Sequence, residues 1–331
     1  MSATQYNDLL LHVGYPKAGS TSLQRRLFTN PSSGFCSPWG QQAPILIEHV
    51  RVTDTFVFDE AVDELRATYD EEIKEARSKN LTPVLSFEHL LVDPMGGQVD
   101  RREGIRRMST LFPGAKVLLI IREQKSIILS AYLEHLRRGF ATKLDRFLGI
   151  DKRREPGFGC TCPLDLFLYD RLISHMFEHF GKENVLVLPL EQLGSSAFLE
   201  QIYSFVGQPF HEDAVKRMQS KQRQARKSDF VFLRPLNRIG MSRYMTRDRD
   251  SLLRKAAYGL NLALNPLTPA TLYNRNRRLM KQRIAGHVGD YFEDSNRRTS
   301  ELTGIDLASL GYPVGKLPTS KTRSKNNDPK T

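Results

Sequence analysis

Residues 9–23 read LLLHVGYPKAGSTSL, a short apolar run, a glycine-containing turn and residues suited to the start of a helix. The run covers residues 9–13 and stops at Gly14, and the helix is expected over residues 20–28. This order predicts a buried strand followed by a helix. The turn between them would aim backbone N–H groups and a helix N-terminus at an anion.

Three further apolar runs repeat the pattern along the chain, at residues 83–87, 116–121 and 184–188. Helices are expected over residues 124–138 and 164–180. Strands that alternate with helices predict an α/β fold with one parallel β-sheet that is covered by helices on both faces.

Composition and charge limit the classes of protein that fit. The chain has 331 residues, of which 40% are hydrophobic and 26% charged, so it can bury a sizeable core. We expect a single domain over residues 1–315, and a disordered basic tail over 316–331, where apolar side chains are scarce. The formal net charge is +12, and residues 221–283 alone carry sixteen Lys or Arg against three Asp. Such a balance favours anionic partners.

Three features of the sequence predict a soluble cytoplasmic protein. No apolar run approaches the length of a membrane span. The N-terminus lacks the charged start of a signal peptide. Cys36, Cys160 and Cys162 have neither redox-pair nor zinc-site spacing, so we expect reduced thiols.

Gly14 and Gly19 have the spacing of a phosphate-binding loop, a weak signal that gains weight from the strand before it and the helix after it. An ordinary turn with Lys17 in solvent is the alternative. In nucleotide triphosphatases a lysine directly follows the second glycine, whereas Ser20 holds that place here.

Residues 14–23 resemble the 5′-phosphosulfate loop of sulfotransferases that use 3′-phosphoadenosine 5′-phosphosulfate (PAPS), especially bacterial members. The typical run of that family is Tyr-Pro-Lys-Ser-Gly-Thr-Thr, from which Ala18 and Ser20 depart mildly. The resemblance implies a P-loop NTPase-like sulfotransferase fold, a reaction that needs no metal, and a lysine, Lys17, that stabilises the leaving group. It implies donor contacts from Pro16, Lys17, Ala18, Gly19, Ser20, Thr21 and Ser22.

A second family element pairs an arginine at a strand end with a serine eight positions later, and Arg122 and Ser130 match it. The resemblance implies that both side chains hold the 3′-phosphate of the donor. A surface ion pair for Arg122 and a backbone-bonded helix residue for Ser130 are the alternatives. Residues 181–193 and 291–313 also resemble family segments.

The Arg-Lys-Gly-x-x-Gly motif of animal cytosolic members is absent, so other residues must complete the donor site. The best candidates are Arg223, Arg226 and Lys227, in the basic stretch that follows residue 220. The later basic cluster at residues 275–283 fits a solvated helix face, or a surface for an anionic acceptor or a weak contact with an anionic membrane.

Glu88 and His89 follow the strand at residues 83–87, at the edge where ligands bind in open α/β sheets. Phe87-Glu88 resembles the Phe-Glu-Lys of glycosaminoglycan-modifying members, in which the glutamate is the base. Glu88 is therefore the first candidate for the base and His89 the second, and the acceptor is expected to be a hydroxyl of a carbohydrate or glycolipid. A solvated glutamate or a helix cap is the alternative for Glu88.

Two rival functions remain open at this point. A P-loop kinase or nucleotide triphosphatase would use the same strand, loop and helix, but would need a metal-binding Asp at a strand end. A basic nucleic-acid-binding protein would act through residues 221–283, which match no known recognition motif. No nucleic acid is therefore expected as a partner.

Overall fold

A computed structural model describes residues 5–40, 43–93, 100–150, 162–219, 225–240 and 252–315. Its centre is a five-stranded sheet in the order β2-β3-β1-β4-β5, in which every neighbouring pair is parallel. The strands are β1 (Leu10–Gly14), β2 (Phe35–Cys36), β3 (Thr82–Phe87), β4 (Lys116–Ile121) and β5 (Val185–Pro189). The predicted α/β class is confirmed.

The sequence predicts the four long strands to within a residue or so at each end. The fit is good because β1, β3 and β4 are almost entirely buried, and a strand buried on both faces is a continuous apolar run. Strand β2 was not predicted, since two residues, Phe35 and Cys36, are too few to form a pattern.

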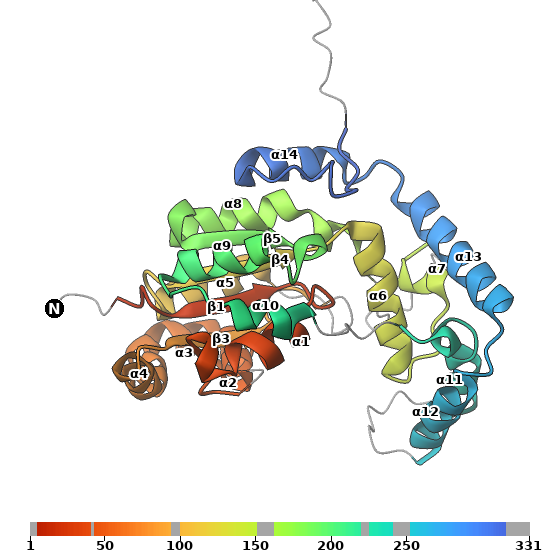
Figure 1. The fold of residues 1–331 in the computed structure, drawn as a ribbon, viewed down its shortest axis with the longest axis horizontal. Coiled ribbons are helices and arrows are strands. Elements are labelled where there is room, and N and C mark those ends of the chain that lie inside the picture. Colours follow the sequence, from red (N-terminus) through yellow and green to blue (C-terminus); the bar gives the residue numbers. More distant parts are fainter. Residues whose placement is uncertain are drawn as a thin grey trace, which may run out of the picture.

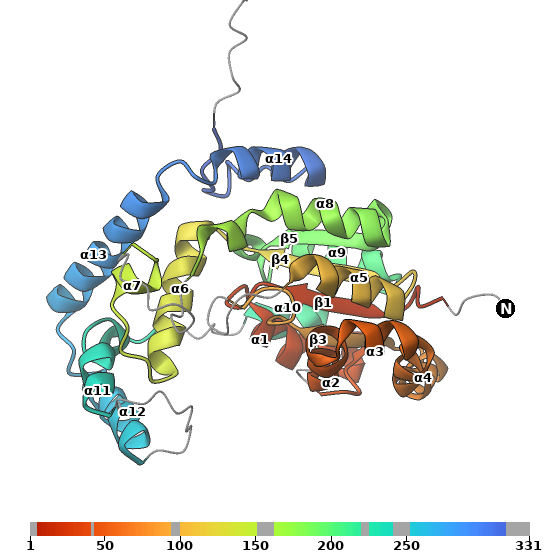
Figure 2. The same cartoon turned by 180° about the vertical axis from the view of Figure 1, so that it is seen from behind.

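Helices cover both faces of the sheet (Figures 1 and 2). One layer contains α4 (Val62–Ser78), α5 (Arg101–Leu111) and α8 (Tyr169–Phe180), and α14 (Glu293–Thr303) packs on the outside of α8. The other contains α1 (Ser20–Leu23), which continues as the π-helical segment η1 (Gln24–Phe28), with α9 (Ser196–Val206) and α10 (Glu212–Gln219). Short helices α2 (Pro44–Ile47), α3 (Thr55–Glu60) and α7 (Leu144–Phe147) lie in the connections.

Helix α6 (Gln124–Arg137) follows β4 and leads away from the sheet (Figure 1). It packs against the one-turn helix η7 (Lys227–Phe230), α11 (Leu233–Gly240) and α13 (Ala270–Val288). Helix α12 (Leu252–Leu264) packs on α11 and η7. The basic segment is therefore attached to the molecule largely through α6.

Among the described residues, no helix combines the length and the hydrophobicity that a membrane span requires. Cys36 and Cys162 are free thiols, and Cys160 lies outside the described residues. The predicted tail at residues 316–331 lies outside them as well.

Candidate active site

Three predicted site elements meet at the carboxyl edge of the sheet. Val13 of β1 is paired with Phe87 of β3, so Glu88, which follows Phe87, lies beside the start of the loop. On the other side Gly14 is paired with Ile120 of β4, two residues before Arg122. The strand order thus brings Glu88, the loop and Arg122 next to one another.

The loop between β1 and α1 is held in an unusual backbone conformation. Gly14, Lys17 and Gly19 all have positive φ values, of 128°, 68° and 86°. For a residue with a Cβ atom such as Lys17, this region costs about 1 kcal/mol or more. A Cβ atom on Gly19 would also lie 2.7 Å from Leu190 Cδ1, so a side chain there would meet the segment after β5.

The loop presents a row of backbone donors. Within the described part of the chain, none of the N–H groups of residues 17–21 donates a hydrogen bond. They lie at the start of the continuous helical segment from Ser20 to Phe28. Unpaired N–H groups at a helix N-terminus form a site for an anion such as a phosphate. The loop therefore fits a phosphate group chemically.

Two side chains from the region after β4 reach this loop. Glu134 of α6 forms an ion pair with Lys17, with 3.2 Å between Oε2 and Nζ. Arg122 Nη1 donates a 2.9 Å hydrogen bond to the backbone oxygen of Lys17. The loop lysine is therefore held from both its backbone and its side chain.

Ser130 lies on the same helix, α6, as the Glu134 that contacts Lys17. Ser130 is four residues before Glu134, one helical turn away on the same face, and that face meets Lys17 through Glu134. The helix begins where Glu123 caps the N–H groups of Lys125 and Ser126 at 3.0 and 2.8 Å. Arg122 immediately before this cap is half-buried, and its burial lowers its pKa.

The charges around Lys17 stabilise the ionised form of Glu134. Burial alone would raise the pKa of Glu134, but the charge and hydrogen bond of Lys17, with Arg137 and Arg138, outweigh it and leave the pKa below its usual value. A carboxylate therefore accompanies the lysine that we expect to meet the donor.

Glu88 belongs to a buried polar network behind the loop. Gln24 Nε2 donates to Glu88 Oε2 and to Ser86 Oγ, both at 2.9 Å, and Ser86 Oγ lies 2.7 Å from His12 Nδ1. Glu88 is only 7% exposed. Burial lowers the pKa of His12 to about 4, against the opposing charge of Glu88. His12 is therefore a buried, hydrogen-bonded histidine of the core.

His89 faces a different set of groups. Its Nε2 atom lies 3.5 Å from Arg138 Nη2, its Nδ1 atom lies 3.5 Å from Asp93 Oδ1, and its backbone oxygen accepts a hydrogen bond from Arg51. Arg138 Nε is 3.9 Å from Glu134 Oε1. The contacts through Arg138 and Glu134 connect His89 to Lys17, so both candidate bases lie beside the loop.

The residues expected to complete the donor site are only partly described. Arg223 lies outside the described residues. Lys227 is exposed, and Arg226 is partly buried against Tyr258, whose hydroxyl lies 3.0 Å from Arg226 Nη1. The segment is fixed to α6 because Arg137 Nη2 forms a 2.6 Å ion pair with Asp229.

The sequence did not single out Gln24, Arg138 or the partnership of Glu134 with Lys17. Glu134 could nevertheless have been identified from the sequence. Its four-residue distance from Ser130 was a usable signal, since it places both side chains on one helix face. Gln24 carried a similar signal, being four residues after Ser20 in the predicted helix.

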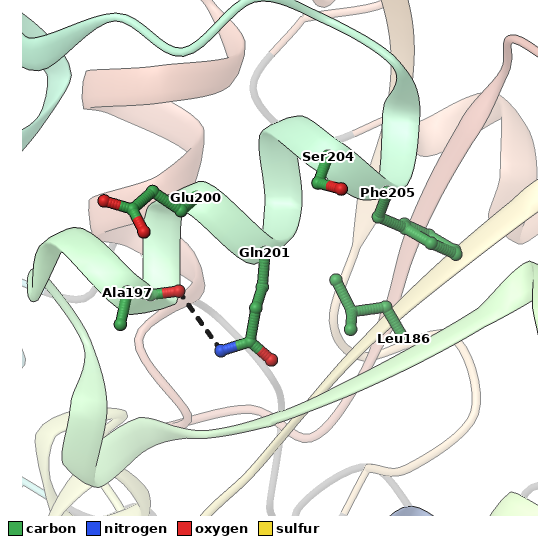
Figure 3. A pocket seen from close by; sticks show the side chains of 6 residues that line it. All are labelled: Leu186, Ala197, Glu200, Gln201, Ser204 and Phe205. Carbon is green, nitrogen blue, oxygen red and sulfur yellow. Dashed lines mark hydrogen bonds between the residues drawn. The ribbon is translucent and has the colours of Figure 1, made fainter.

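A surface pocket lies elsewhere, between α9 and the edge strand β5 (Figure 3). Its lining residues are Leu186, Ala197, Glu200, Gln201, Ser204 and Phe205. None of the predicted site residues is among them. In the described ranges, no group of three or more His, Cys, Asp or Glu residues is arranged to hold a metal ion.

No protein-family model matches the chain, and no curated protein does. Similar solved structures include a sulfotransferase from Alicyclobacillus acidocaldarius, with 20% identity, coverage of 70% of this chain and 93% of that one, and a TM-score of 0.46. The sulfotransferase domain of the Synechococcus PCC 7002 olefin synthase has 15% identity, coverage of 86% and 96%, and a TM-score of 0.40. A sulfotransferase domain from the curacin biosynthetic pathway has 14% identity, coverage of 86% of this chain and 98% of that one, and a TM-score of 0.40. Identities of 20% or less with TM-scores below 0.5 are too low to assign a family or an activity to this chain.

Proposed function

We propose that the chain is a sulfotransferase that moves a sulfuryl group from PAPS to an acceptor hydroxyl. The observation that carries the proposal is the loop at residues 14–21, where unpaired backbone N–H groups, a strained Lys17 and Arg122 converge at the edge of a parallel sheet. An anion with both a phosphate and a leaving oxygen suits such a site, because the N–H groups bind the phosphate and the lysine neutralises the oxygen.

The donor would bind with its 5′-phosphosulfate on residues 16–22. Arg122 and Ser130 would hold its 3′-phosphate. Arg122 directly follows β4, the strand paired with β1 beside the loop, and Ser130 lies on α6, the helix that comes next. Lys17 would exchange its contact with Glu134 for the bridging oxygen of the donor as that oxygen becomes anionic. The ion pair with Glu134 holds the lysine near the loop before the donor binds.

The acceptor hydroxyl would attack the sulfur atom in line with the leaving oxygen. An S–O bond forms to the acceptor, the S–O bond to the 5′-phosphate breaks, and the hydroxyl proton passes to a base. Glu88 is the first candidate for that base and His89 the second, because both lie beside the loop on the β3 side, away from Arg122. A carbohydrate or glycolipid is the acceptor class that we propose, on the resemblance of Phe87-Glu88 to carbohydrate-modifying members.

The decisive experiment is transfer of radiolabelled sulfate from PAPS to a panel of carbohydrate and glycolipid acceptors, in the presence of excess chelator. Activity that persists in chelator supports the transferase. Activity that appears only with ATP and magnesium would establish the P-loop kinase or triphosphatase instead.

Donor specificity provides a second arm of the same experiment. Arg122→Ala should weaken binding of adenosine 3′,5′-bisphosphate by about tenfold to a hundredfold, because a charge-assisted contact contributes roughly 1.5–3 kcal/mol. Binding of adenosine 5′-phosphate should change far less. Ser130→Ala should have the same selectivity with a smaller effect. Equal weakening of both nucleotides would exclude a role for these residues in reading the 3′-phosphate.

A further inference from the structure

Helix α12 has its polar and apolar faces in the reverse of the usual arrangement. Tyr258 and Asn261 point inward, where Tyr258 meets Arg226 and Asn261 Nδ2 donates to the buried Asp229 at 2.9 Å. Apart from Lys255, the outward positions with described side chains are apolar and follow at helical spacing. They are Ala256, Gly259, Leu260, Leu262 and Ala263, and they continue into Pro266 and Leu267 just after the helix.

The leucines are the large exposed side chains on this face. Leu267 is 73% exposed and Leu260 is 50% exposed. A solvated helix normally turns its polar residues outward, and a contiguous exposed apolar patch marks an interaction site. We call the seven outward residues just listed the α12 apolar face.

Positive charge lies next to the α12 apolar face. Neither α12 nor α13 contains an Asp or Glu residue. Helix α13 exposes Arg275, Arg277, Arg278 and Lys281, and none of these four forms an ion pair with a described residue. Arg275 and Arg278 lie within about 12 Å of the start of α13, the helix that the loop containing Leu267 enters.

We propose that the α12 apolar face and these four basic side chains of α13 dock the protein on an anionic lipid bilayer. Exposed leucines beside lysine and arginine suit the surface of an anionic bilayer. The leucines would enter the boundary of the acyl chains, and the cations would meet the headgroups. Both figures place α12 and α13 at the end of the molecule away from the sheet (Figures 1 and 2). Helix α12 packs on α11 and η7, and α13 packs on α6 and η7, which leaves the side chains named above exposed.

The chemistry of the surface favours lipid over the two main alternative occupants. A second copy of the chain, packed by two-fold symmetry, would set the same unpaired cations against each other. A nucleic acid would use the cations but would leave the leucines in water, because its affinity comes chiefly from phosphate contacts. Docking on lipid is independent of the reaction proposed above, because none of these residues belongs to the candidate active site.

The test is cosedimentation of the full chain with vesicles of phosphatidylcholine alone and of phosphatidylcholine mixed with phosphatidylserine. We expect binding to the mixed vesicles and little binding to the neutral ones. Leu267→Glu should lower the partition coefficient about tenfold, because one inserted leucine is lost. Arg278→Glu should lower it about fivefold or more, because each basic side chain near an anionic surface contributes about that factor.

Matched variants elsewhere separate docking from general electrostatics. Phe56→Glu changes an exposed apolar side chain on α3, and Lys74→Glu reverses an exposed charge on α4. Both controls should bind within about twofold of the parent. If the net charge of the protein alone governed binding to the vesicles, the controls would instead lose as much affinity as the α12 and α13 variants.

Three results would overturn the proposal: absence of binding to the mixed vesicles, equal loss in the controls, or binding that Leu267→Glu leaves unchanged. Sedimentation velocity without vesicles adds a fourth. If the parent is a dimer and Leu267→Glu is a monomer, a second copy covers the α12 apolar face and lipid does not.

Discussion

Lys17 is the residue on which the proposed chemistry depends most. It combines a left-handed backbone, an ion pair with Glu134 and a carbonyl oxygen bonded to Arg122. Backbone strain at a non-glycine residue persists only where surrounding contacts enforce it, and it is concentrated at functional sites. The contacts of Glu134 and Arg122 supply that enforcement.

Lys17→Ala should reduce the turnover number for sulfuryl transfer about a hundredfold or more, and donor affinity much less. The lysine charge contributes most when the bridging oxygen becomes anionic in the transition state. Steady-state kinetics with varied PAPS measures both quantities, with Lys125→Ala on the first turn of α6 as the matched control. Near-normal turnover with only a raised KM for PAPS would contradict the leaving-group role.

The two candidate bases can be ordered by substitution. Glu88→Gln keeps the shape of the side chain and an oxygen that can accept from Gln24, so the network with Ser86 should persist. It removes the proton acceptor, which should cost about a hundredfold to ten-thousandfold in turnover while binding of adenosine 3′,5′-bisphosphate is retained. An inactive His89→Ala variant alongside an active Glu88→Gln variant would reverse the order.

At the scale of single elements, buried histidines link the fold to pH. His135 of α6 is buried in a stack with Phe140, with ring centroids 4.2 Å apart, and Nε2 lies 2.9 Å from Thr142 Oγ1. Burial, with the nearby charge of Arg138, lowers its pKa from 6.5 to about 4. The unfolded chain therefore takes up a proton at pH values where the folded chain does not.

This shift makes the contribution of His135 to stability fully present above pH 6.5 and lost progressively towards pH 4. Between pH 7 and pH 5 the loss should be about 2 kcal/mol for this residue. His135→Gln keeps an amide near Thr142 but does not titrate, so its free energy of unfolding should fall about 2 kcal/mol less over that interval. Denaturant unfolding at the two pH values measures the difference, and parallel losses in parent and variant would refute the shifted pKa.

The sequence predicted the elements whose ends follow from a local apolar pattern. It missed the contacts that depend on how distant elements pack against one another. Strand β4 was predicted at its observed ends, Lys116 and Ile121, because burial on both faces makes the whole strand apolar. The pair of Glu134 with Lys17 was missed, because it is set by the direction in which α6 leaves the sheet. The buried partnership of Gln24 with Glu88 likewise requires the register of β1 against β3.

At the scale of the whole molecule, α6 connects the loop edge to the basic segment. Glu134 lies near its end and contacts Lys17, while Arg137, one turn on, contacts Asp229 of η7. Arg137 Nη1 is itself 3.6 Å from Glu134 Oε2. A change in the basic segment therefore has a short route of packed charges to the loop.

The two basic groups distinguished in the sequence lie on different elements of the structure. Arg226 and Lys227 lie at the η7 end of α6, a few contacts from Lys17, whereas Arg278 lies on the exposed side of α13. We expect the first group to help close the donor site and the second to leave the donor untouched. Lys227 offers the cleaner test, because Arg226 also contacts Tyr258 and its loss could disturb α12.

Lys227→Glu should weaken binding of adenosine 3′,5′-bisphosphate and flatten the dependence of its affinity on salt, since a cation near the donor phosphates becomes an anion. Arg278→Glu, with the same change in net charge, should leave the affinity within about twofold. Arg278 is exposed on α13 and takes no part in the ion pairs that connect η7 to Lys17, and salt screens exposed charges beyond about 10 Å at ordinary ionic strength. Isothermal titration calorimetry on both variants at two salt concentrations decides the matter. An unaffected Lys227→Glu variant would mean that the donor is closed over by other residues, with Arg223 the first to substitute next. Equal weakening by both variants would instead indicate that the overall charge of the chain, and no particular contact in this segment, draws the nucleotide to the loop.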